Sequence, residues 1–372
     1  MLFSSLILRN FRNYTSLQID WSYGVNIICG LNAQGKSNLL EAVSYLSTGS
    51  SFRSGKDEEL IRWGQQFFYI QGTVLKNNIE YNLSVGYTRA GRKVAKVNGN
   101  QRKKLSDFIG ILNTVIFSPE DLDIVKSNPA RRRKYLDGEM IQLFPSYLHL
   151  IWQYQKIIFQ RNNLLKEING RKNKESLLAI WDEQLVDIGS KIIKKRMEVL
   201  KKLSPLARLM HRKITGGAED LEIVYVGLEK DDVLKSADLN CLKDLFFEKL
   251  EKVRKEEISR GVTIVGPHRD DFKLIINNND VKKYGSQGQQ RTTALSLKMA
   301  ELELMKSETS EYPVLLLDDV MSELDESRRE HLLQIIGNKV QTFITATDAD
   351  YNFSGNQQKI KISQGKILNI SR

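Results

Sequence analysis

Apolar and polar positions follow a strand-like pattern over the first third of the chain. Residues 6–8 and 17–19 are short apolar-rich runs that predict a β-hairpin, and residues 69–74 and 81–87 predict further strands. Val25–Cys29 is a short apolar run, as is typical of a buried strand. Residues 1 to about 120 are therefore expected to be rich in strands.

From about residue 120 the apolar positions change to helical spacing. Residues 144–165 and 178–192 repeat apolar side chains in steps of three and four, and the polar residues 169–174 separate them. This pattern predicts an antiparallel helical hairpin, although the core of a plain helical bundle has the same spacing. Strands are expected at 221–226 and 262–265, so the position where the helical region ends stays open by tens of residues.

The C-terminal part of the chain returns to strands. Residues 342–345 predict a strand, and residues 359–362 and 366–370 predict a small hairpin. We therefore expect residues 1–120 and 259–372 to build one α/β domain together, with a mainly helical insert at residues 121–258.

A glycine-rich loop follows the first buried strand. Gly30 to Ser37 fits the pattern G-x-x-x-x-G-K-[ST], and apolar residues at helical spacing come after it. Such a loop curls its backbone N–H groups around phosphates at a helix N-terminus, while its lysine reaches the β- and γ-phosphates and its serine binds Mg²⁺. The nucleotide-binding residues are expected to be Gly30, Leu31, Asn32, Ala33, Gln34, Gly35, Lys36, Ser37 and Asn38.

An acidic pair near the other end of the chain supplies the second half of this site. The apolar run that begins at Val314 ends in Asp318 and Asp319, as a buried strand with carboxylates at its C-terminal end would. Asp318 is expected to hold Mg²⁺ with Ser37, and Asp319 to orient or deprotonate the attacking water. Aspartate is shorter than glutamate and would hold the attacking water less closely than a glutamate at this position. We therefore expect slow turnover. A capped core strand would explain this segment if it stood alone.

A serine-led segment precedes the acidic strand. Ser286 to Arg291 opens a predicted helix, with Ser286 as a good N-cap and Gly288 leaving the helix start uncovered. A helix terminus of this kind binds anions, although an ordinary capped helix has the same sequence. Ser286 is assigned a catalytic role beside Lys36 and Asp319, and Gly288 and Gln289 are expected to contact nucleotide.

Several further motifs lie along the chain. They are Leu8-Arg9-Asn10-Phe11-Arg12-Asn13-Tyr14, Lys36-Ser37-Asn38-Leu39-Leu40-Glu41-Ala42, Phe117-Ser118-Pro119-Glu120-Asp121-Leu122, Arg131-Arg132-Arg133, Gly266-Pro267-His268-Arg269-Asp270-Asp271 and Leu317-Asp318-Asp319-Val320 with Ser322-Glu323-Leu324-Asp325. Together these motifs resemble the RecF family, bacterial recombination-repair ATPases related to SMC proteins. The resemblance covers nearly the whole chain in the expected order.

The resemblance implies an ABC-type ATPase head formed from the N- and C-terminal segments, with an inserted mainly helical lid. In such heads the serine-led helix, similar to the ABC signature, reaches the γ-phosphate held by a second copy. The resemblance further implies ATP-dependent dimerisation on DNA and a preference for gapped DNA or single/double-strand junctions. Work with RecR and RecO to load recombinase is implied in the same way. Arg12 and Arg53 are implied to contact nucleotide or to signal its presence. Thr345 stands where transporter ATPases often place a histidine.

Composition limits the class of protein. The chain has 372 residues, of which 41% are hydrophobic and 27% charged, as is ordinary for a globular protein. No run approaches the ~20 apolar residues of a membrane span, and residues 1–7 do not form a secretory signal. Cys29 and Cys241 are too few for a disulfide framework, and scattered His and Cys show no metal-ligand spacing. A cytoplasmic protein is therefore expected, and His268 is expected to be structural or phosphate-sensing.

The net charge of +11 and the pI near 9.3 favour a polyanionic partner. Lysines spread over a solvated surface would produce the same charge, but basic residues cluster at 89–104, 131–134 and 191–202. Such clusters follow a phosphate backbone without reading its sequence. The residues expected to contact DNA are Arg92, Lys93, Lys103, Lys104, Arg131, Arg132, Arg133 and Lys195.

Three functions remain open from the sequence. The first is a weak ATPase that acts as a DNA clamp in the repair of gaps and the maintenance of replication forks, with slow, DNA-stimulated hydrolysis. The second is a structural DNA adaptor that binds ATP with negligible turnover, which Asp319 makes possible. The third is a transporter ATPase subunit, although such heads place the signature much sooner after the phosphate loop, and without a long helical insert.

Overall fold

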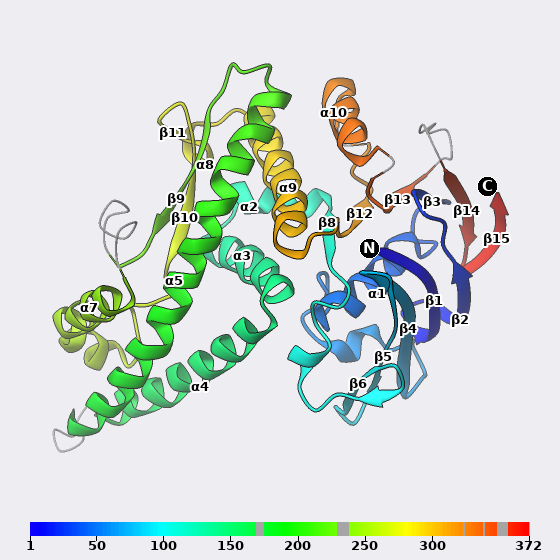
Figure 1. Ribbon diagram of the computed structural model, residues 1–372. Coiled ribbons are helices and arrows are strands. Elements are labelled where there is room, and N and C mark those ends of the chain that lie inside the picture. The colour runs from blue at the N-terminus through cyan, green and yellow to red at the C-terminus, as the bar shows by residue number, and fades with distance from the viewer. Residues whose placement is uncertain (169–174, 229–237, 323, 338, 348–355, 372) are drawn as a thin grey trace. The chain divides into compact units, whose positions relative to one another are not determined.

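The computed structural model describes residues 1–168, 175–228, 238–322, 324–337, 339–347 and 356–371. The chain forms two compact units, whose elements are labelled in Figure 1. The first unit combines Met1–Asp121 with Leu295–Arg372, and the second consists of Leu122–Ala294. The two ends of the chain therefore fold together.

The first unit contains a mainly parallel six-stranded sheet to which both ends of the chain contribute. In spatial order the strands are β15 (Lys366–Ser371), β14 (Gln357–Ser363), β3 (Val25–Cys29), β13 (Thr342–Ala346), β12 (Val314–Asp318) and β8 (Thr114–Phe117). All neighbours are parallel except the β14–β15 hairpin, and Figure 1 shows blue β3 beside red β14. Every residue of β3, β12 and β13 is buried. The strands and the C-terminal hairpin predicted for this region are confirmed.

A second six-stranded sheet of the first unit is antiparallel. Its strands are β2 (Tyr14–Asp20), β1 (Leu2–Phe11), β4 (Phe67–Lys76), β5 (Ile79–Thr88), β6 (Lys93–Val97) and β7 (Asn100–Gln101). The predicted first hairpin is confirmed, because Leu6 lies opposite Ile19 in the register of β1 and β2. Asn98 and Gly99 turn between β6 and β7 with φ angles of 51° and 78°, which asparagine and glycine tolerate best.

Helix α1 (Lys36–Thr48) contacts strands of both sheets. Its apolar residues Leu39, Leu40, Val43 and Leu46 are at most 1% exposed, so they join the two sheets in one core. Full burial of each such side chain is worth about 1.5–3 kcal/mol. The remaining helices of this unit are η1 (Asp57–Leu60), η2 (Leu105–Asp107), η3 (Pro119–Asp121), the end of α9 (Gln287–Thr309) and α10 (Glu326–Ile336).

The second unit is mainly helical. Its helices are α2 (Leu122–Lys126), α3 (Pro129–Leu143), α4 (Pro145–Ile168), α5 (Glu175–Ile214), α7 (Leu239–Arg260), α8 (Val281–Tyr284) and the start of α9. Helices α4 and α5 pack against each other, as the predicted hairpin requires, while its polar linker at 169–174 lies outside the described residues.

A small sheet completes the second unit. Its order is β11 (Asn279–Asp280), β10 (Asp271–Ile276), β9 (Leu221–Val226), and β9 is the strand expected at 221–226. Strand β10 pairs with β9 over the whole of both strands, which places β10 in the second unit. This unit continues to Ala294, past the insert end expected at residue 258.

The strand expected at residues 262–265 is wrong. This run is irregular, and its first three N–H groups donate to the Glu257 carbonyl and to side chains rather than to a neighbouring strand. The Thr263 N–H donates to Oδ1 of Asn162 (2.8 Å), and the Ile264 N–H donates to Oε1 of Glu257 (2.8 Å). A short apolar run bounded by glycine therefore satisfied the strand pattern without having a strand partner.

Candidate functional site

The phosphate loop leaves β3 and enters α1, and its two glycines are sterically required. Gly30 has a φ of 153°, and a Cβ at this position would lie 2.3 Å from the Ile362 carbonyl oxygen. Gly35 has a φ of 110°, and its Cβ would lie 2.5 Å from Nδ2 of Asn13. No other residue fits either position without moving backbone or buried atoms. The predicted strand, loop and helix are therefore confirmed, with the loop curled at the start of α1.

Two turns from opposite ends of the chain hold the loop in this shape. Tyr14 donates from its hydroxyl to the Gly35 carbonyl (2.9 Å), and Asn13 donates from Nδ2 to the Gln34 carbonyl (3.0 Å). From the β14–β15 turn, the N–H groups of Gln364 and Gly365 donate to Gln34 Oε1 (2.5 Å) and the Gln34 carbonyl (3.1 Å). Asn13 and Tyr14 belong to a sequence motif, but no role was predicted for them, because their partners are backbone groups distant in sequence.

Lys36 folds back over the loop. Its ammonium donates to the carbonyls of Gly30 (2.7 Å) and Leu31 (3.0 Å). Burial lowers the pKa of Lys36, and the carboxylates of Asp319 and Asp318 oppose this shift. Those carboxylates at the end of β12 therefore act electrostatically on the loop lysine.

The acidic end of β12 contacts the phosphate loop, although β13 lies between β12 and the strand β3 that leads into the loop. Ser37 Oγ donates to Asp318 Oδ1 (2.6 Å), and Thr345 Oγ1 donates to the same oxygen (2.9 Å). The Asp319 N–H donates to Thr345 Oγ1 (2.9 Å). Since β13 lies between β3 and β12, Thr345 connects the two halves of the site. From the sequence, Thr345 stood out only because transporter ATPases often have a histidine at this position. Its hydrogen bonds to both Asp318 and Asp319 were not predicted.

Asp319 extends away from the strand end. It is exposed, and its φ of 56° lies in the left-handed region, which aspartate tolerates better than most residues do. Ser322 Oγ donates to the Asp319 carbonyl (2.9 Å) and holds this turn. In the motif that follows, Glu323 lies outside the described residues. The exposed carboxylate of Asp319 is available to a water molecule or a ligand.

Arg12 is engaged by protein groups in this structure. Its guanidinium donates through Nε (2.9 Å) and Nη2 (2.7 Å) to the carboxylate of Glu41, which is fully buried. Nη2 also donates to Ser54 Oγ (2.5 Å). Arg53 donates from Nη1 to Asn38 Oδ1 (3.1 Å) in the first turn of α1. Arg53 therefore lies beside the loop. A nucleotide contact by Arg12 remains a prediction, because protein groups bind its guanidinium in this structure.

The serine-led segment forms the start of α9. Ser286 Oγ accepts from the Gln289 N–H (3.2 Å), and Gln289 Oε1 accepts from the Ser286 N–H (2.8 Å). This reciprocal capping confirms the predicted N-cap. Ser286 is exposed and Gly288 is partly exposed, so the helix start is open to a ligand. Gln289 is also held by Glu219, whose Oε1 accepts from Nε2 (2.8 Å).

The basic residues expected to contact DNA differ in their surroundings. Arg132 is only 5% exposed, and its guanidinium donates through Nε and Nη2 to the carboxylate of Asp271 (2.7 and 2.8 Å). Arg133 donates to the Asp270 carbonyl (2.7 Å). The predicted DNA contact of Arg132 is therefore replaced by a structural role, because an ion pair already occupies its buried guanidinium.

The other predicted DNA contacts lie closer to solvent. Arg131 pairs with Asp123 (3.6 Å), Lys93 with Asp57 (2.9 Å), and Lys195 with Glu198 (3.3 Å). Arg92, Lys103 and Lys104 are exposed. Among the described residues, the side chains of these last three have no hydrogen-bond or ion-pair partner. They are the basic side chains of this set with the most freedom to contact phosphates.

His268 is part of a partly buried polar network. Its Nδ1 lies 2.9 Å from the Tyr154 hydroxyl, and its Nε2 lies 3.1 Å from the Thr263 carbonyl. Burial lowers the pKa of His268 to about 4, and burial raises the pKa of the neighbouring Asp270. A neutral imidazole that donates to a carbonyl has a structural role. Within the described part of the chain, no group of three or more His, Cys, Asp and Glu side chains could hold a metal ion.

No helix in the described part of the chain is both long and apolar enough to span a membrane.

Comparisons with known proteins agree with this geometry. The model of the RecF/RecN/SMC N-terminal domain matches residues 2–367. The DNA replication and repair proteins RecF of Bacillus cereus (strain G9842) and Bacillus anthracis (strain A0248) are each 48% identical over 351 residues, which is 94% of this chain and 93% of the relative.

Solved structures show the same similarity. A structure of the recombination mediator protein RecF with ATP, in the RecFOR pathway, has a TM-score of 0.92 and 41% identity, and covers 100% of this chain and 97% of its own. The Smc head domain of Pyrococcus furiosus has a TM-score of 0.56 at 15% identity over 99% of this chain and 95% of its own, which supports the fold alone.

Proposed function

Because this chain belongs to the RecF family of DNA replication and repair proteins, we propose that it is an ATP-dependent DNA clamp. It would act in the recombinational repair of gaps and at replication forks. The observation that carries the proposal is the hydrogen bond between Ser37 and Asp318, because it joins the loop after β3 to the acid after β12. Two segments at opposite ends of the chain would thus build one nucleotide site. A similar protein that has been solved with ATP supports ATP as the nucleotide.

The loop residues would bind the triphosphate through their backbone and through Lys36. Leu31, Asn32 and Ala33 are exposed at the start of α1, where the helix dipole favours negative charge. The Lys36 ammonium, which lies on two loop carbonyls, is placed to exchange them for phosphate oxygens. The loop would not need to change shape when nucleotide binds, because hydrogen bonds from Asn13 and Tyr14 already hold its backbone.

The oxygens of Ser37 and Asp318 fit Mg²⁺. They lie 2.6 Å apart, and a hydroxyl and a carboxylate are hard ligands that Mg²⁺ prefers beside phosphate oxygens. Bound Mg²⁺ would neutralise charge on the phosphates. Thr345, which donates to Asp318, would orient the carboxylate. Asp319, which is exposed and held by its backbone to Thr345, would orient or deprotonate the attacking water.

The start of α9 would complete the site of a second copy. Ser286 caps this helix and is exposed, so its hydroxyl would be placed to donate to a γ-phosphate at the helix start. Two ATP molecules would then join two chains in an isologous dimer. Loss of the γ-phosphate would remove the bridging contact and release the clamp.

Sedimentation velocity tests the dimer. At micromolar protein with ATP, the wild-type chain should sediment with the mass of two copies, and the Lys36→Ala variant with the mass of one. Ser286→Arg should bind ATP but remain a monomer, because the larger side chain blocks the helix start. Ser310→Arg, at the exposed residue that directly follows the same helix, is the matched control and should dimerise. An unchanged wild-type mass with ATP would contradict the clamp.

Salt dependence tests the DNA contacts. The exposed Lys103 and Lys104 should contact phosphates, so replacing both with alanine should lower duplex affinity. The slope of log K against log salt should fall by about 0.9 for each lost contact. Lys252→Ala, which removes a lysine paired with Glu248, should leave the slope unchanged. A flat titration for the wild-type chain would count against the basic clusters.

RecR and RecO are proposed as partners in recombinase loading. The support is family membership and the similarity to a RecF structure of the RecFOR pathway. Co-sedimentation of this chain with RecR on gapped DNA, compared with duplex DNA, tests it.

A further inference from the structure

The turn between α5 and β9, in the second unit, places a carboxylate beside the end of α5. The helix closes with a hydrogen bond from the Thr215 N–H to the His211 carbonyl (3.0 Å). Gly216 and Gly217 follow with φ angles of 61° and 84°, a left-handed conformation that glycine adopts without strain. Because these two residues reverse the chain, Glu219 lies against His211 in the last turn of α5.

Both oxygens of the Glu219 carboxylate are engaged by protein groups. Oε2 lies 2.9 Å from Nε2 of His211, and Oε1 accepts from Nε2 of Gln289 (2.8 Å). His211 is fully buried, and burial lowers its pKa, while the hydrogen bond to Glu219 opposes this shift. Because a carboxylate only accepts hydrogen bonds, the neutral imidazole carries its proton on Nε2. His211 therefore holds Glu219 from the side of α5.

Gln289 connects this carboxylate to Ser286 at the start of α9. Its Oε1 accepts from the Ser286 N–H (2.8 Å), and its backbone N–H donates to Ser286 Oγ (3.2 Å). In the reversed orientation the amide oxygen would face the Glu219 carboxylate and the amide NH₂ would face the Ser286 N–H, so both side-chain hydrogen bonds would be lost. Glu219 therefore fixes the Gln289 amide in the orientation that caps the helix.

Glu219 is suited to hold the helix start and unsuited to touch a phosphate. Its side chain is 20% exposed, whereas Ser286 is exposed. A carboxylate repels a γ-phosphate, so Glu219 favours phosphate binding only through the groups that it holds. Because Oγ of Ser286 accepts from the Gln289 N–H, the hydroxyl hydrogen is left to donate away from the helix.

We propose that Glu219 is a positioning residue of the nucleotide site between two copies of this chain. Through Gln289 it holds the Ser286 hydroxyl in place for the γ-phosphate bound by the second copy, and His211 holds Glu219 in turn. The proposal rests on the proposed ATP-dependent dimer, and it adds two residues that lie outside every motif of the nucleotide site. Gln289 acts here by holding Ser286 rather than by touching the nucleotide.

Sedimentation velocity with ATP tests this role in Glu219→Ala, which removes the hydrogen bonds to His211 and Gln289. A lost cap costs a factor of about five at one helix start and the dimer contains two, so the dissociation constant of the dimer should rise about 25-fold. Affinity for a fluorescent ATP analogue at the phosphate loop should stay as in wild type, whereas misfolding would weaken both. Glu222→Ala, which removes an exposed carboxylate of β9, is the matched control and should dimerise normally.

Glutamine at the same position separates positioning from charge. Glu219→Gln keeps an oxygen that accepts from Gln289, and the neutral imidazole of His211 accepts from the new amide in its other tautomer. This variant should dimerise at least as tightly as wild type. If charge alone mattered, Glu219→Ala would also dimerise more tightly, because it too removes a negative charge near the triphosphate.

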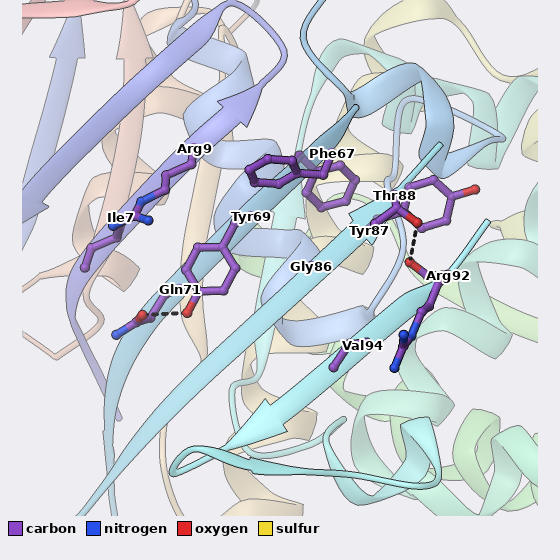
Figure 2. A pocket seen from close by; sticks show the side chains of 11 residues that line it. Ile7, Arg9, Phe67, Tyr69, Gln71, Gly86, Tyr87, Thr88, Arg92 and Val94 are labelled. Carbon is purple, nitrogen blue, oxygen red and sulfur yellow. Dashed lines mark hydrogen bonds between the residues drawn. The ribbon is translucent and has the colours of Figure 1, made fainter. Parts of the chain in front are cut away.

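A double-mutant cycle tests whether Glu219 acts through Gln289. Gln289→Leu removes the amide and should weaken the dimer about as much as Glu219→Ala, and combining the two should cause no further loss. The control for loss of an amide is Gln71→Leu on β4, which should dimerise normally. Gln71 Oε1 accepts from the Tyr69 hydroxyl (2.7 Å), as the dashed line in Figure 2 shows.

The outcomes separate this role from the dimer itself. The role of Glu219 is overturned if Glu219→Ala, shown to be folded by circular dichroism, dimerises as tightly as wild type or more tightly, or if its loss adds to that of Gln289→Leu. Normal dimerisation of Gln289→Leu overturns it as well, which decides the matter if Glu219→Ala does not fold. In each of these cases a dimeric wild type leaves the clamp standing. A wild-type chain that stays monomeric with ATP overturns the clamp and the positioning role together.

Discussion

The phosphate loop of the first unit and residues 266–271 of the second unit are both charged, glycine-led turns, but they differ in burial. In the loop, Leu31 and Asn32 are exposed, and Asp319 across the site is exposed as well. In the second segment, Asp270 is 6% exposed and accepts from the Tyr225 hydroxyl (2.5 Å). The first turn and the Asp319 carboxylate are open to a ligand, whereas the Asp270 carboxylate of the second turn is satisfied by the protein.

The second unit extends this pairing through its core. Arg161 is 1% exposed and donates to Asp182 (2.7 Å), to Glu257 (2.7 Å) and to Thr263 Oγ1 (2.9 Å). Buried ions need such partners, since desolvation costs several kcal/mol for each ion. The comparison shows that residue type alone does not separate a binding arginine or aspartate from a structural one. Exposure and the presence of a protein partner separate them.

The largest expected effect is on the buried network. Arg161→Met removes the cation between Asp182 and Glu257 and leaves buried carboxylates without their partner, so the free energy of unfolding should fall by about 3–5 kcal/mol. Urea unfolding followed by circular dichroism measures it. The control is Arg254→Met, because Arg254 also pairs with Asp182 but is 25% exposed, and it should cost about 1 kcal/mol. Equal costs for the two variants would contradict the role of burial.

The next largest effect is on turnover. Asp319→Asn keeps the shape of the exposed side chain but removes its charge, so the ATPase rate should fall about a hundredfold. ATP affinity should change little, since the loop and Asp318 remain. Asp325→Asn, which removes an exposed carboxylate from the same segment, is the control and should keep the rate. A normal ATPase rate in Asp319→Asn would indicate that a residue other than Asp319 orients the attacking water.

Lys36→Ala should weaken binding of an ATP analogue about 10- to 100-fold, because a hydrogen bond to a charged group contributes about 1.5–3 kcal/mol. Titration with a fluorescent analogue measures this change. Stability should fall little, because the two carbonyls that lose their donor lie at an open loop. Lys56→Ala, an exposed lysine of the same unit, should bind normally. Normal affinity in Lys36→Ala would show that the open loop is not the phosphate site.

The smallest effect, over the first pH unit below about 6.5, concerns the pH dependence of stability. Burial lowers the pKa of His268 from 6.5 to about 4, so the unfolded chain takes up the proton first as pH falls. Its contribution to stability is therefore complete above about pH 6.5 and is lost between about pH 6.5 and 4, by at most about 1.4 kcal/mol per pH unit. The raised pKa of Asp270 acts in the opposite direction. His268→Gln retains Asp270, so the difference between the two unfolding curves should isolate the histidine. Parallel curves for the two proteins would contradict its burial as a neutral group.

Much of the site follows from local patterns. The loop from Gly30 to Ser37, the buried strand ending at Asp318 and the cap at Ser286 each depend on residues close together in sequence, and all three occur as predicted. The strand expected at 262–265 failed because a four-residue apolar run does not specify whether its backbone pairs with a strand or with side chains. Arg132 failed as a DNA contact because a run of arginines does not reveal which guanidinium is buried.

The sequence alone determined the chemistry of this protein: a phosphate loop, an acidic strand end and a capped helix. These need only backbone conformation and residues a few positions apart. Only the tertiary structure decided what joins them. Thr345 bridges the site because β13 lies between β3 and β12, and Arg9 and Arg92 lie on opposite sides of β4 and β5 because of the strand order of the second sheet. Strand order and burial depend on contacts between distant segments, which no local pattern encodes.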